Sequence, residues 1–198
     1  MSRTFARPHT SVIIDEHPIL HIGPLLNPII QFDKVTYRHP GGEGHEPPAL
    51  DDISITINNG EWVAIVGSNG SGKTTFARHC NALLQPTTGR VNIEGLNTND
   101  RSLHTQIRSR VGMVFQNPED QIVSTVIEED CAFGPENLGV PTHEIQRRVT
   151  ESLQTVEMYD QRMRPPHLLS AGQMQRVALA GVLAMQPKCV IFDESTAM

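Results

Sequence analysis

One stretch of this sequence has the residue types and spacing that bind polyphosphate. Residues 67–75 read GSNGSGKTT and fit the pattern G-x-x-x-x-G-K-[ST]. Glycines let the backbone curl so that successive N–H groups point inward as an anion nest, and the helix predicted to follow adds its positive end. Lys73 would then reach the β- and γ-phosphates, and the Thr74 hydroxyl would ligate Mg²⁺. The residues predicted to bind phosphate are Gly67, Ser68, Asn69, Gly70, Ser71, Gly72, Lys73, Thr74 and Thr75.

The loop leaves alternatives open. A glycine-rich turn between a strand and a helix can also bind nothing, and the loop alone does not distinguish kinases, GTPases, motors and transport ATPases. A second stretch, CVIFDE at 189–194, narrows the choice. Four apolar residues precede Asp193 and Glu194, so both carboxylates are expected at the carboxyl end of a buried strand, where ligands of open α/β sheets bind. Beside a phosphate loop, Asp193 would hold Mg²⁺, and Glu194 would orient or deprotonate the attacking water.

A third stretch predicts a helix whose first turn faces outward. Residues 168–187 read LLSAGQMQRVALAGVLAMQP, in which Ser170 and Gln173 form an S-x-x-Q capping box. Such a helix start offers N–H groups and a positive dipole end to an anion. The alternative is a capped core helix without a ligand.

The hydrophobic pattern predicts the elements that position these residues. Alternating apolar and polar residues early in the chain indicate antiparallel strands, and the apolar run before the phosphate loop indicates a further strand. The middle of the chain is largely helical, and the order of elements predicts an α/β fold. The predicted strands are 29–39, 53–57, 61–67, 90–95, 110–115 and 189–192, and the predicted helices are 73–85, 142–156 and 174–185.

Composition excludes several classes of protein. The 198 residues, 38% hydrophobic and 19% charged, suit one sizeable core or two small ones. A net charge of −6 argues against a nucleic-acid partner. Three cysteines without C-x-x-C spacing fit a reducing cytosol better than a metal knuckle or a disulfide framework. No apolar run reaches the roughly 18 residues of a membrane span, so any membrane role is expected to be peripheral.

Residues 1–28, with four prolines, are predicted to be a flexible N-terminal extension.

The phosphate loop, LSAGQMQR and CVIFDE, in that order, resemble the motifs of ATP-binding cassette (ABC) ATPases. The resemblance implies a P-loop NTPase with a RecA-like core, an antiparallel β subdomain and a helical signature subdomain, here an ABC ATPase domain at 29–198 with helical residues 117–180. In that family the signature motif faces the ATP of a second cassette, which would give this role to Ser170, Gly172 and Gln173. Ala171 stands where glycine is usual. Because a helix start does not need a positive φ, we expect weakened rather than lost function.

Two further positions follow from the same resemblance. Gln116 resembles the Q-loop glutamine, which contacts metal or water, and His39 falls where the family has an aromatic residue that stacks on adenine. Tyr37 lies on the same strand face and is expected to be a core residue. The alternative for His39 is a histidine that binds no ligand.

Residues 116–141, QNPEDQIVSTVIEEDCAFGPENLGVP, resemble ATPase subunits of energy-coupling factor (ECF) transporters, including cobalt and nickel importers. The resemblance implies ATP and Mg²⁺ as cofactors, a second ABC ATPase subunit (a copy or a paralogue), an EcfT-like transmembrane coupling protein, and a membrane subunit that captures a vitamin or metal ion. It also implies a location on the cytoplasmic face of the cell membrane. An acidic patch in this region would suit arginines on a partner helix, with a solvated acidic face as the alternative. The patch is Glu119, Asp120, Glu128, Glu129 and Asp130.

Two other functions stay open at this stage: a soluble ABC ATPase of DNA maintenance or translation, and a nucleotide-binding regulator without turnover. The sequence does not identify the solute. In ABC ATPases further strands and a switch histidine follow the turn that begins at STAM, residues 195–198. The chain therefore resembles a cassette truncated at its C-terminus, and the 198 residues alone are expected to be marginally stable and to hydrolyse ATP negligibly.

Overall fold

The computed structural model describes residues 3–7, 10–14, 27–40 and 47–193. The chain forms two compact units, Met1–Ile107 and Arg108–Met198, each with its own internal contacts. The two units are described separately below.

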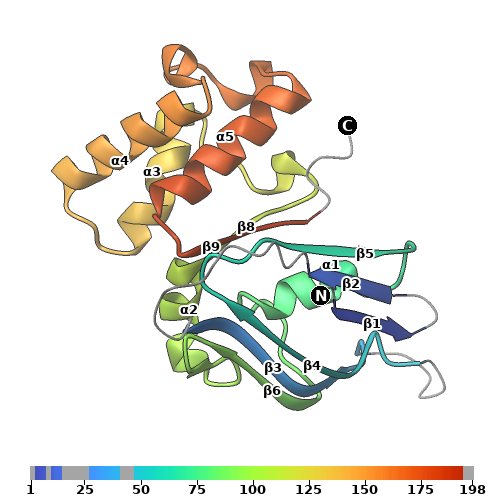
Figure 1. Ribbon diagram of the computed structural model, residues 1–198. Coiled ribbons are helices and arrows are strands. Elements are labelled where there is room, and N and C mark those ends of the chain that lie inside the picture. The colour runs from blue at the N-terminus through green and yellow to red at the C-terminus, as the bar shows by residue number, and fades with distance from the viewer. Residues whose placement is uncertain (1–2, 8–9, 15–26, 41–46, 194–198) are drawn as a thin grey trace, which may run out of the picture. The chain divides into compact units, whose positions relative to one another are not determined.

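The first unit is built mainly of antiparallel strands (Figure 1). One sheet has the order β4-β3-β6-β7, and its central strand β3 matches the alternating pattern of the sequence. In the second sheet β2 lies between β1 and β5, and the apolar strand predicted before the phosphate loop is β5. The strands are β1 (Arg3–Arg7), β2 (Thr10–Ile14), β3 (Pro28–Tyr37), β4 (Leu50–Asn58), β5 (Val63–Gly67), β6 (Thr88–Ile93) and β7 (Leu96–Asn97).

Part of the N-terminal segment forms strands. Strand β1 pairs antiparallel with β2, and β2 pairs with β5 from Thr10↔Gly67 to Ile14↔Val63. Residues 15–26 of the predicted extension lie outside the described residues. The short run TSVII at 10–14 is rich in β-branched residues, which favour strands. Of the four prolines in this segment, Pro28 begins β3, and Pro8, Pro18 and Pro24 lie outside the described residues.

Helix α1 (Lys73–His79) packs on β3 through aromatic rings. The rings of Phe32 and Phe76 stack with centroids 4.4 Å apart and an angle of 12° between their planes. The helix is shorter than the predicted 73–85, because the backbone turns at Ala82, whose φ is +57°. A second short helix, α2 (His104–Arg110), buries Ile107.

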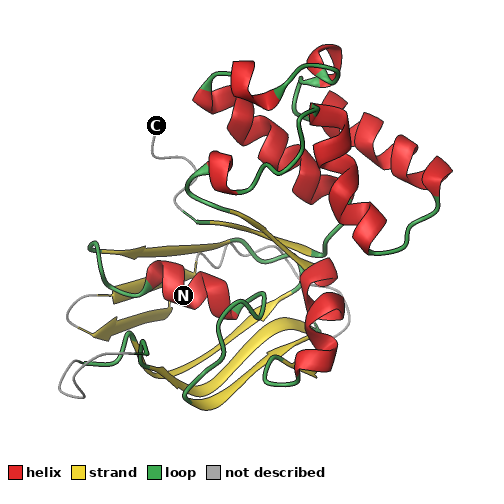
Figure 2. Ribbon diagram, turned by 180° about the vertical axis from the view of Figure 1, so that it is seen from behind, coloured by secondary structure: helices red, strands yellow, loops and turns green. Residues whose placement is uncertain are grey.

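The second unit is a small parallel sheet with a helical bundle (Figures 1 and 2). Strands β8 (Val111–Val114) and β9 (Cys189–Phe192) pair in parallel. Helices α3 (Ile127–Asn137), α4 (Thr142–Thr155) and α5 (Ala171–Ala184) share one apolar core. The face predicted for the helix at 142–156 is confirmed, since Ile145, Val149, Leu153 and Val156 are all buried.

Small residues allow the close packing of this unit. On α3 the Cys131 thiol is buried, which raises its pKa to about 12 and keeps it neutral. A Cβ atom on Gly134 would lie 2.8 Å from Met185, beyond the end of α5. On β8 a Cβ atom on Gly112 would lie 2.4 Å from Val182 of α5 and 3.2 Å from Pro187.

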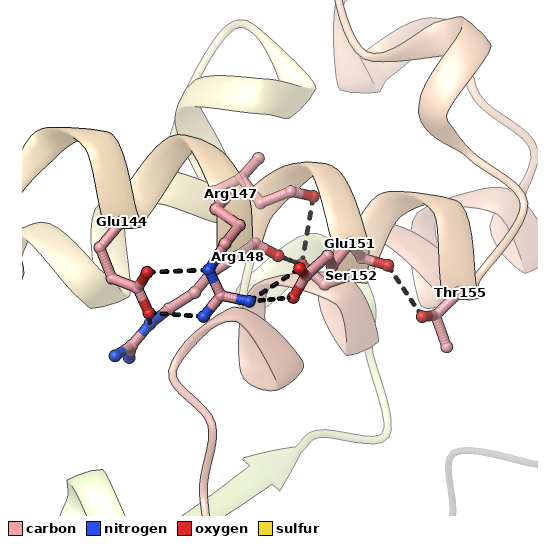
Figure 3. A network of polar contacts seen from close by, with 7 residues as sticks. Glu144, Arg147, Arg148, Glu151, Ser152 and Thr155 are labelled. Carbon is pink, nitrogen blue, oxygen red and sulfur yellow. Dashed lines mark hydrogen bonds and ion pairs between the residues drawn. The ribbon is translucent and has the colours of Figure 1, made fainter.

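The outer face of α4 carries a network of ion pairs (Figure 3). Glu144 accepts hydrogen bonds from Arg147 and Arg148 at 2.6 to 2.8 Å, and Arg147 also donates to Glu151 at 2.7 Å. Hydrogen bonds from the two arginines lower the pKa of Glu144 to about 2. Exposed pairs of this kind stabilise a helix only modestly and mark a solvated face.

Strand β9 is more exposed than predicted. Its apolar run predicted a buried strand, yet Phe192 is 52% exposed; in the apolar strand β5, Val66 is likewise 44% exposed. Continuous apolar runs are typical of strands covered on both faces. Within the described residues β9 pairs with β8 and β5 pairs with β2, each along one edge.

In the part of the chain that the structure describes, no helix has the length and apolar character needed to cross a membrane.

The contact at Gly112 predicts a large effect on stability. Gly112→Val would force a side chain against Val182 and Pro187, and overpacking of this kind costs about 1–3 kcal/mol of unfolding free energy. Urea unfolding followed by circular dichroism measures it. Gly172→Ala is the matched control, since nothing lies within 4 Å of a Cβ atom there. An equal loss of stability in both variants would contradict the packing argument.

Candidate functional site

The phosphate loop leaves β5 at Gly67 and enters α1 at Lys73. Gly70 and Gly72 have φ values of +79° and +93°, a conformation that only glycine adopts at little cost. The Ser71 N–H donates to the carbonyl oxygen of Ser68 at 3.2 Å, which closes a turn within the loop. Loop residues 67–70 are exposed, as a ligand-binding turn requires.

Gly72 has a second reason to be glycine. A Cβ atom there would lie 2.4 Å from the carbonyl oxygen of Ala49, closer than real Cβ contacts come. The Ala49 N–H in turn donates to the carbonyl oxygen of Tyr37 at 2.9 Å. The start of α1 is therefore held against the segment that links β3 and β4.

Lys73 lies over the loop. Its Nζ donates to the carbonyl oxygens of Gly67 and Ser68, both at 3.1 Å. The ammonium charge is thus placed on the same turn whose N–H groups would meet an anion. Thr74 is half-buried in the first turn of α1, whereas Thr75 is 7% exposed, so its side chain belongs to the core.

This loop fits a magnesium–nucleoside triphosphate in its donor set and in its glycine geometry. The described residues include no cluster of three or more His, Cys, Asp or Glu side chains that could hold a metal ion alone. Magnesium in nucleotide sites is typically held by one or two protein groups together with the phosphates and water. A hydroxyl group, as predicted for Thr74, can be one of these protein groups.

His39 stands just beyond the end of β3 and is exposed. Its ring meets that of Tyr37 edge to face, with centroids 5.1 Å apart. Tyr37 itself is 7% exposed, which confirms that it is a core residue. Through the hydrogen bond from Ala49 to Tyr37, this strand end is tied to the segment that Gly72 contacts. His39 and the loop thus belong to one continuous region of the first unit.

In the second unit, Gln116 and Asp193 come to one edge of the sheet. Because β8 and β9 run in parallel with Val114 opposite Phe192, their carboxyl ends coincide. The Asp193 N–H donates to the Val114 carbonyl oxygen at 3.0 Å, and Asp193 is 7% exposed. Gln116 is exposed, two residues beyond Val114. Glu194 lies outside the described residues.

The capping box at the start of α5 is confirmed. The Gln173 N–H donates to Ser170 Oγ at 3.3 Å, and the Ser170 N–H donates to Gln173 Oε1 at 2.9 Å. Ser170, Ala171 and Gly172 are exposed, and the last two have helical backbone. Alanine in place of the usual glycine therefore causes no backbone strain at position 171.

Gln121, for which the sequence predicted no role, joins two elements of the second unit. Its Oε1 accepts from the Phe115 N–H at 3.2 Å, and its Nε2 lies 3.5 Å from the Ala178 carbonyl oxygen on α5. The residue before Gln116 is thereby linked to the helix that Ser170 caps. The signal in the sequence was the N-P-x-x-Q spacing of Asn117, Pro118 and Gln121, which could have predicted this link.

The acidic patch is not uniform. Asp130 Oδ1 accepts from the backbone N–H groups of Val123 and Ser124 at 2.7 and 3.0 Å, which is a structural task. Glu128 forms an ion pair with Arg162 at 4.0 Å, and Glu129 accepts from the Ser124 hydroxyl at 3.1 Å. Exposed carboxylates that could meet a partner remain at Glu119, Asp120 and Glu129.

Comparison with known proteins places this geometry among ABC transporter proteins. A family model described as ABC transporter matches residues 50–197. The "Energy-coupling factor transporter ATP-binding protein EcfA1" of Symbiobacterium thermophilum is 53% identical over 178 residues, which are 88% of this chain and 62% of that protein. The chain thus spans about three fifths of the length of the curated relatives it matches.

Solved structures agree with this similarity. The structure of cbiO1 from Clostridium perfringens, described as part of the ABC transporter complex cbiONQ, has a TM-score of 0.71 at 33% identity and covers 84% of this chain and 65% of that chain. The post-hydrolysis dimer of the cassette MJ0796, bound to ADP and Pi, has a TM-score of 0.74 at 30% identity and covers 84% of this chain and 74% of that chain. These likenesses confirm the predicted α/β fold of the ABC ATPase type.

The geometry of Gly72 predicts a loss of ligand affinity. Gly72→Ala would add a left-handed backbone penalty of about 1–2 kcal/mol to the overlap with Ala49. The loop should then shift, and affinity for MgATP should fall by about tenfold or more in equilibrium dialysis. Gly95→Asn is the control, because Gly95 lies outside the loop, asparagine tolerates its left-handed conformation and a Cβ atom there contacts nothing within 4 Å. Unchanged affinity in Gly72→Ala would contradict the loop assignment.

The hydrogen bonds of Asp130 predict a structural role. Asp130→Ala would leave the N–H groups of Val123 and Ser124 without their acceptor, which costs about 1–3 kcal/mol of unfolding free energy. Thermal denaturation measures the loss. The matched variant Glu119→Ala removes an exposed carboxylate and should leave the melting temperature unchanged. Similar melting temperatures for both variants would contradict the distinction between a structural Asp130 and an exposed Glu119.

Proposed function

Because this chain belongs to the ABC transporter family, we propose that it is the ATP-binding and ATP-hydrolysing subunit of an ECF-type importer. The phosphate loop carries this proposal. Its two left-handed glycines, the approach of Gly72 to Ala49 and the position of the Lys73 ammonium support an anion site at the start of α1. The 53% identity to an energy-coupling factor ATP-binding protein supports the choice of transporter class.

Each unit contributes its own groups. In the first unit the loop residues 67–75 would hold the phosphates, with Lys73 at the β- and γ-phosphates and the Thr74 hydroxyl on Mg²⁺. His39 would stack on adenine. In the second unit Asp193 and Gln116 would be ligands of the metal or its water. When bound, the metal neutralises charge that develops on the phosphate oxygens.

Glu194 would act on the attacking water. A carboxylate next to the metal-binding Asp193 can accept the water's proton as the oxygen attacks the γ-phosphorus, and Gln116 can hold that water in line. The exposed helix start formed by Ser170, Gly172 and Gln173 would meet the ATP of a second cassette. Because Gln173 Oε1 is occupied by the cap, the N–H groups of this turn are the better candidates for the contact.

The proposed partners follow from the relatives. A second ABC ATPase subunit would complete two composite sites, as the dimeric cassette structure suggests. A transmembrane coupling protein would bind the helical unit, with Glu119, Asp120 and Glu129 toward basic residues of that protein. A separate membrane subunit would capture a vitamin or transition metal ion, and this chain would lie on the cytoplasmic face of the membrane. We propose no nucleic-acid partner, because the net charge of −6 would repel a phosphate backbone.

A change at Glu194 tests the reaction. In the complex assembled with its membrane partners, Glu194→Gln keeps a side chain of the same size but removes the base. We expect ATP turnover to fall by about a hundredfold or more while ATP binding is kept. Steady-state phosphate release and equilibrium binding measure the two quantities.

Two controls accompany this experiment. Lys73→Ala should weaken binding itself, because it removes the charge on the loop, and Glu157→Gln, at an 87% exposed side chain, should change neither quantity. Unchanged turnover in Glu194→Gln would exclude Glu194 as the base. Failure to co-purify with membrane proteins would favour a soluble ABC ATPase, and binding without turnover in the unaltered complex would favour a regulator.

A further inference from the structure

Histidine 79, at the end of α1, is fully buried. Its Nδ1 donates to the carbonyl oxygen of Thr75 at 2.7 Å, one turn earlier in the helix. Its Nε2 is buried and has no hydrogen-bond partner among the described residues. Burial lowers the pKa of His79, against smaller opposing effects of the backbone at Thr75 and Gln85. The ring is therefore neutral, with its proton on Nδ1.

The ring of His79 packs against two aromatic rings of strand β3. It meets the ring of Tyr37 edge to face at 4.8 Å and lies 6.5 Å from that of Phe32. Tyr37 in turn meets the ring of His39 edge to face, with centroids 5.1 Å apart. A continuous row of rings therefore leads from α1 to the exposed end of β3.

Tyr37 connects this row to the phosphate loop. Its carbonyl oxygen accepts from Ala49, and the carbonyl oxygen of Ala49 packs against Gly72. The loop and the His39 position are thus joined twice: through the backbone at Ala49, and through α1 and the ring of His79.

We infer that His79 is a positioning residue, whose ring fixes Tyr37, and through Tyr37 the exposed His39 side chain, relative to the phosphate loop. This rests on the proposed function, because it assumes that the loop binds a nucleoside triphosphate. His79 acts through Tyr37 and touches no ligand, since it is fully buried. An apolar residue would fill the same space without burying an unpartnered ring nitrogen, so filling space does not explain the choice of histidine.

The inference separates recognition of the base from recognition of the phosphates. MgATP and magnesium tripolyphosphate share the phosphate contacts, and only ATP carries a base for His39. The ratio of their dissociation constants, measured on the whole chain by isothermal titration calorimetry, therefore reports the His39 position. In His79→Leu, which keeps an apolar side chain but removes the ring, we expect the preference for ATP to fall by about threefold or more, as expected for a lost stacking contact of the usual strength. Affinity for tripolyphosphate should stay within about twofold.

Three further variants make the test specific. His79→Phe restores a ring against Tyr37 and should recover the preference, and His39→Ala should lower it as His79→Leu does. The double variant His39→Ala with His79→Leu should lower it no further, because both changes act on one contact. His104→Asn is the matched control: this partly buried histidine donates to the Thr98 carbonyl oxygen.

Other results would overturn either the role of His79 or the proposed function. A preference for ATP that is unchanged in folded His79→Leu, or that falls only because both ligands weaken equally, would overturn the inference and leave His79 as a core residue. No preference in the unaltered chain would also overturn it. If the unaltered chain bound neither ligand, the proposed function itself would fail, which is a distinct result. Should His79→Leu not fold, His79→Met, which also lacks a ring, replaces it: a lowered preference in folded His79→Met supports the inference, and an unchanged one overturns it.

Discussion

The first unit depends on the contact between the backbone at Gly72 and the carbonyl oxygen of Ala49. Helix α1 begins there, and Ala49 is tied by a hydrogen bond to the last residue of β3. A side chain at position 72 would push the helix away from the strand, and the stacked rings of Phe32 and Phe76 would lose their overlap. One approach between two main chains thus fixes the phosphate loop, the helix that follows it and the strand end that carries His39.

The second unit is organised by backbone hydrogen bonds to side chains. The capping box fixes where α5 begins, Asp130 holds the loop before α3, and Gln121 joins the end of β8 to α5. In each case a polar side chain satisfies N–H groups that secondary structure leaves open. The segments that carry Gln116 and Ser170 therefore belong to one bonded framework inside this unit.

The sequence predicts motifs of neighbouring residues better than it predicts which strands pair and how far they are buried. The phosphate loop, the capping box, the helix at 142–156 and the burial of Tyr37 follow from spacing, because each depends on residues within a few positions of one another. The exposure of Phe192 and the pairing of β2 with β5 could not be predicted, because each depends on which strands lie alongside. The contacts of Gln121, Asp130 and His79 were not predicted for a related reason, because their partners come from other elements or from a turn whose geometry the motif does not specify.

The glycine of β8 has a consequence for the acidic end of β9. Ladder hydrogen bonds are formed by every residue, so they do not by themselves prevent two parallel strands from sliding by one position, and such a slide turns each side chain to the opposite face. At Gly112 no side chain fits between the strand and Val182 and Pro187. Sliding β8 would bring Val111 or Met113 to that place. The alignment in which Val114 lies opposite Phe192, so that Gln116 and Asp193 follow at the same end of the sheet, is therefore selected by the missing side chain of Gly112.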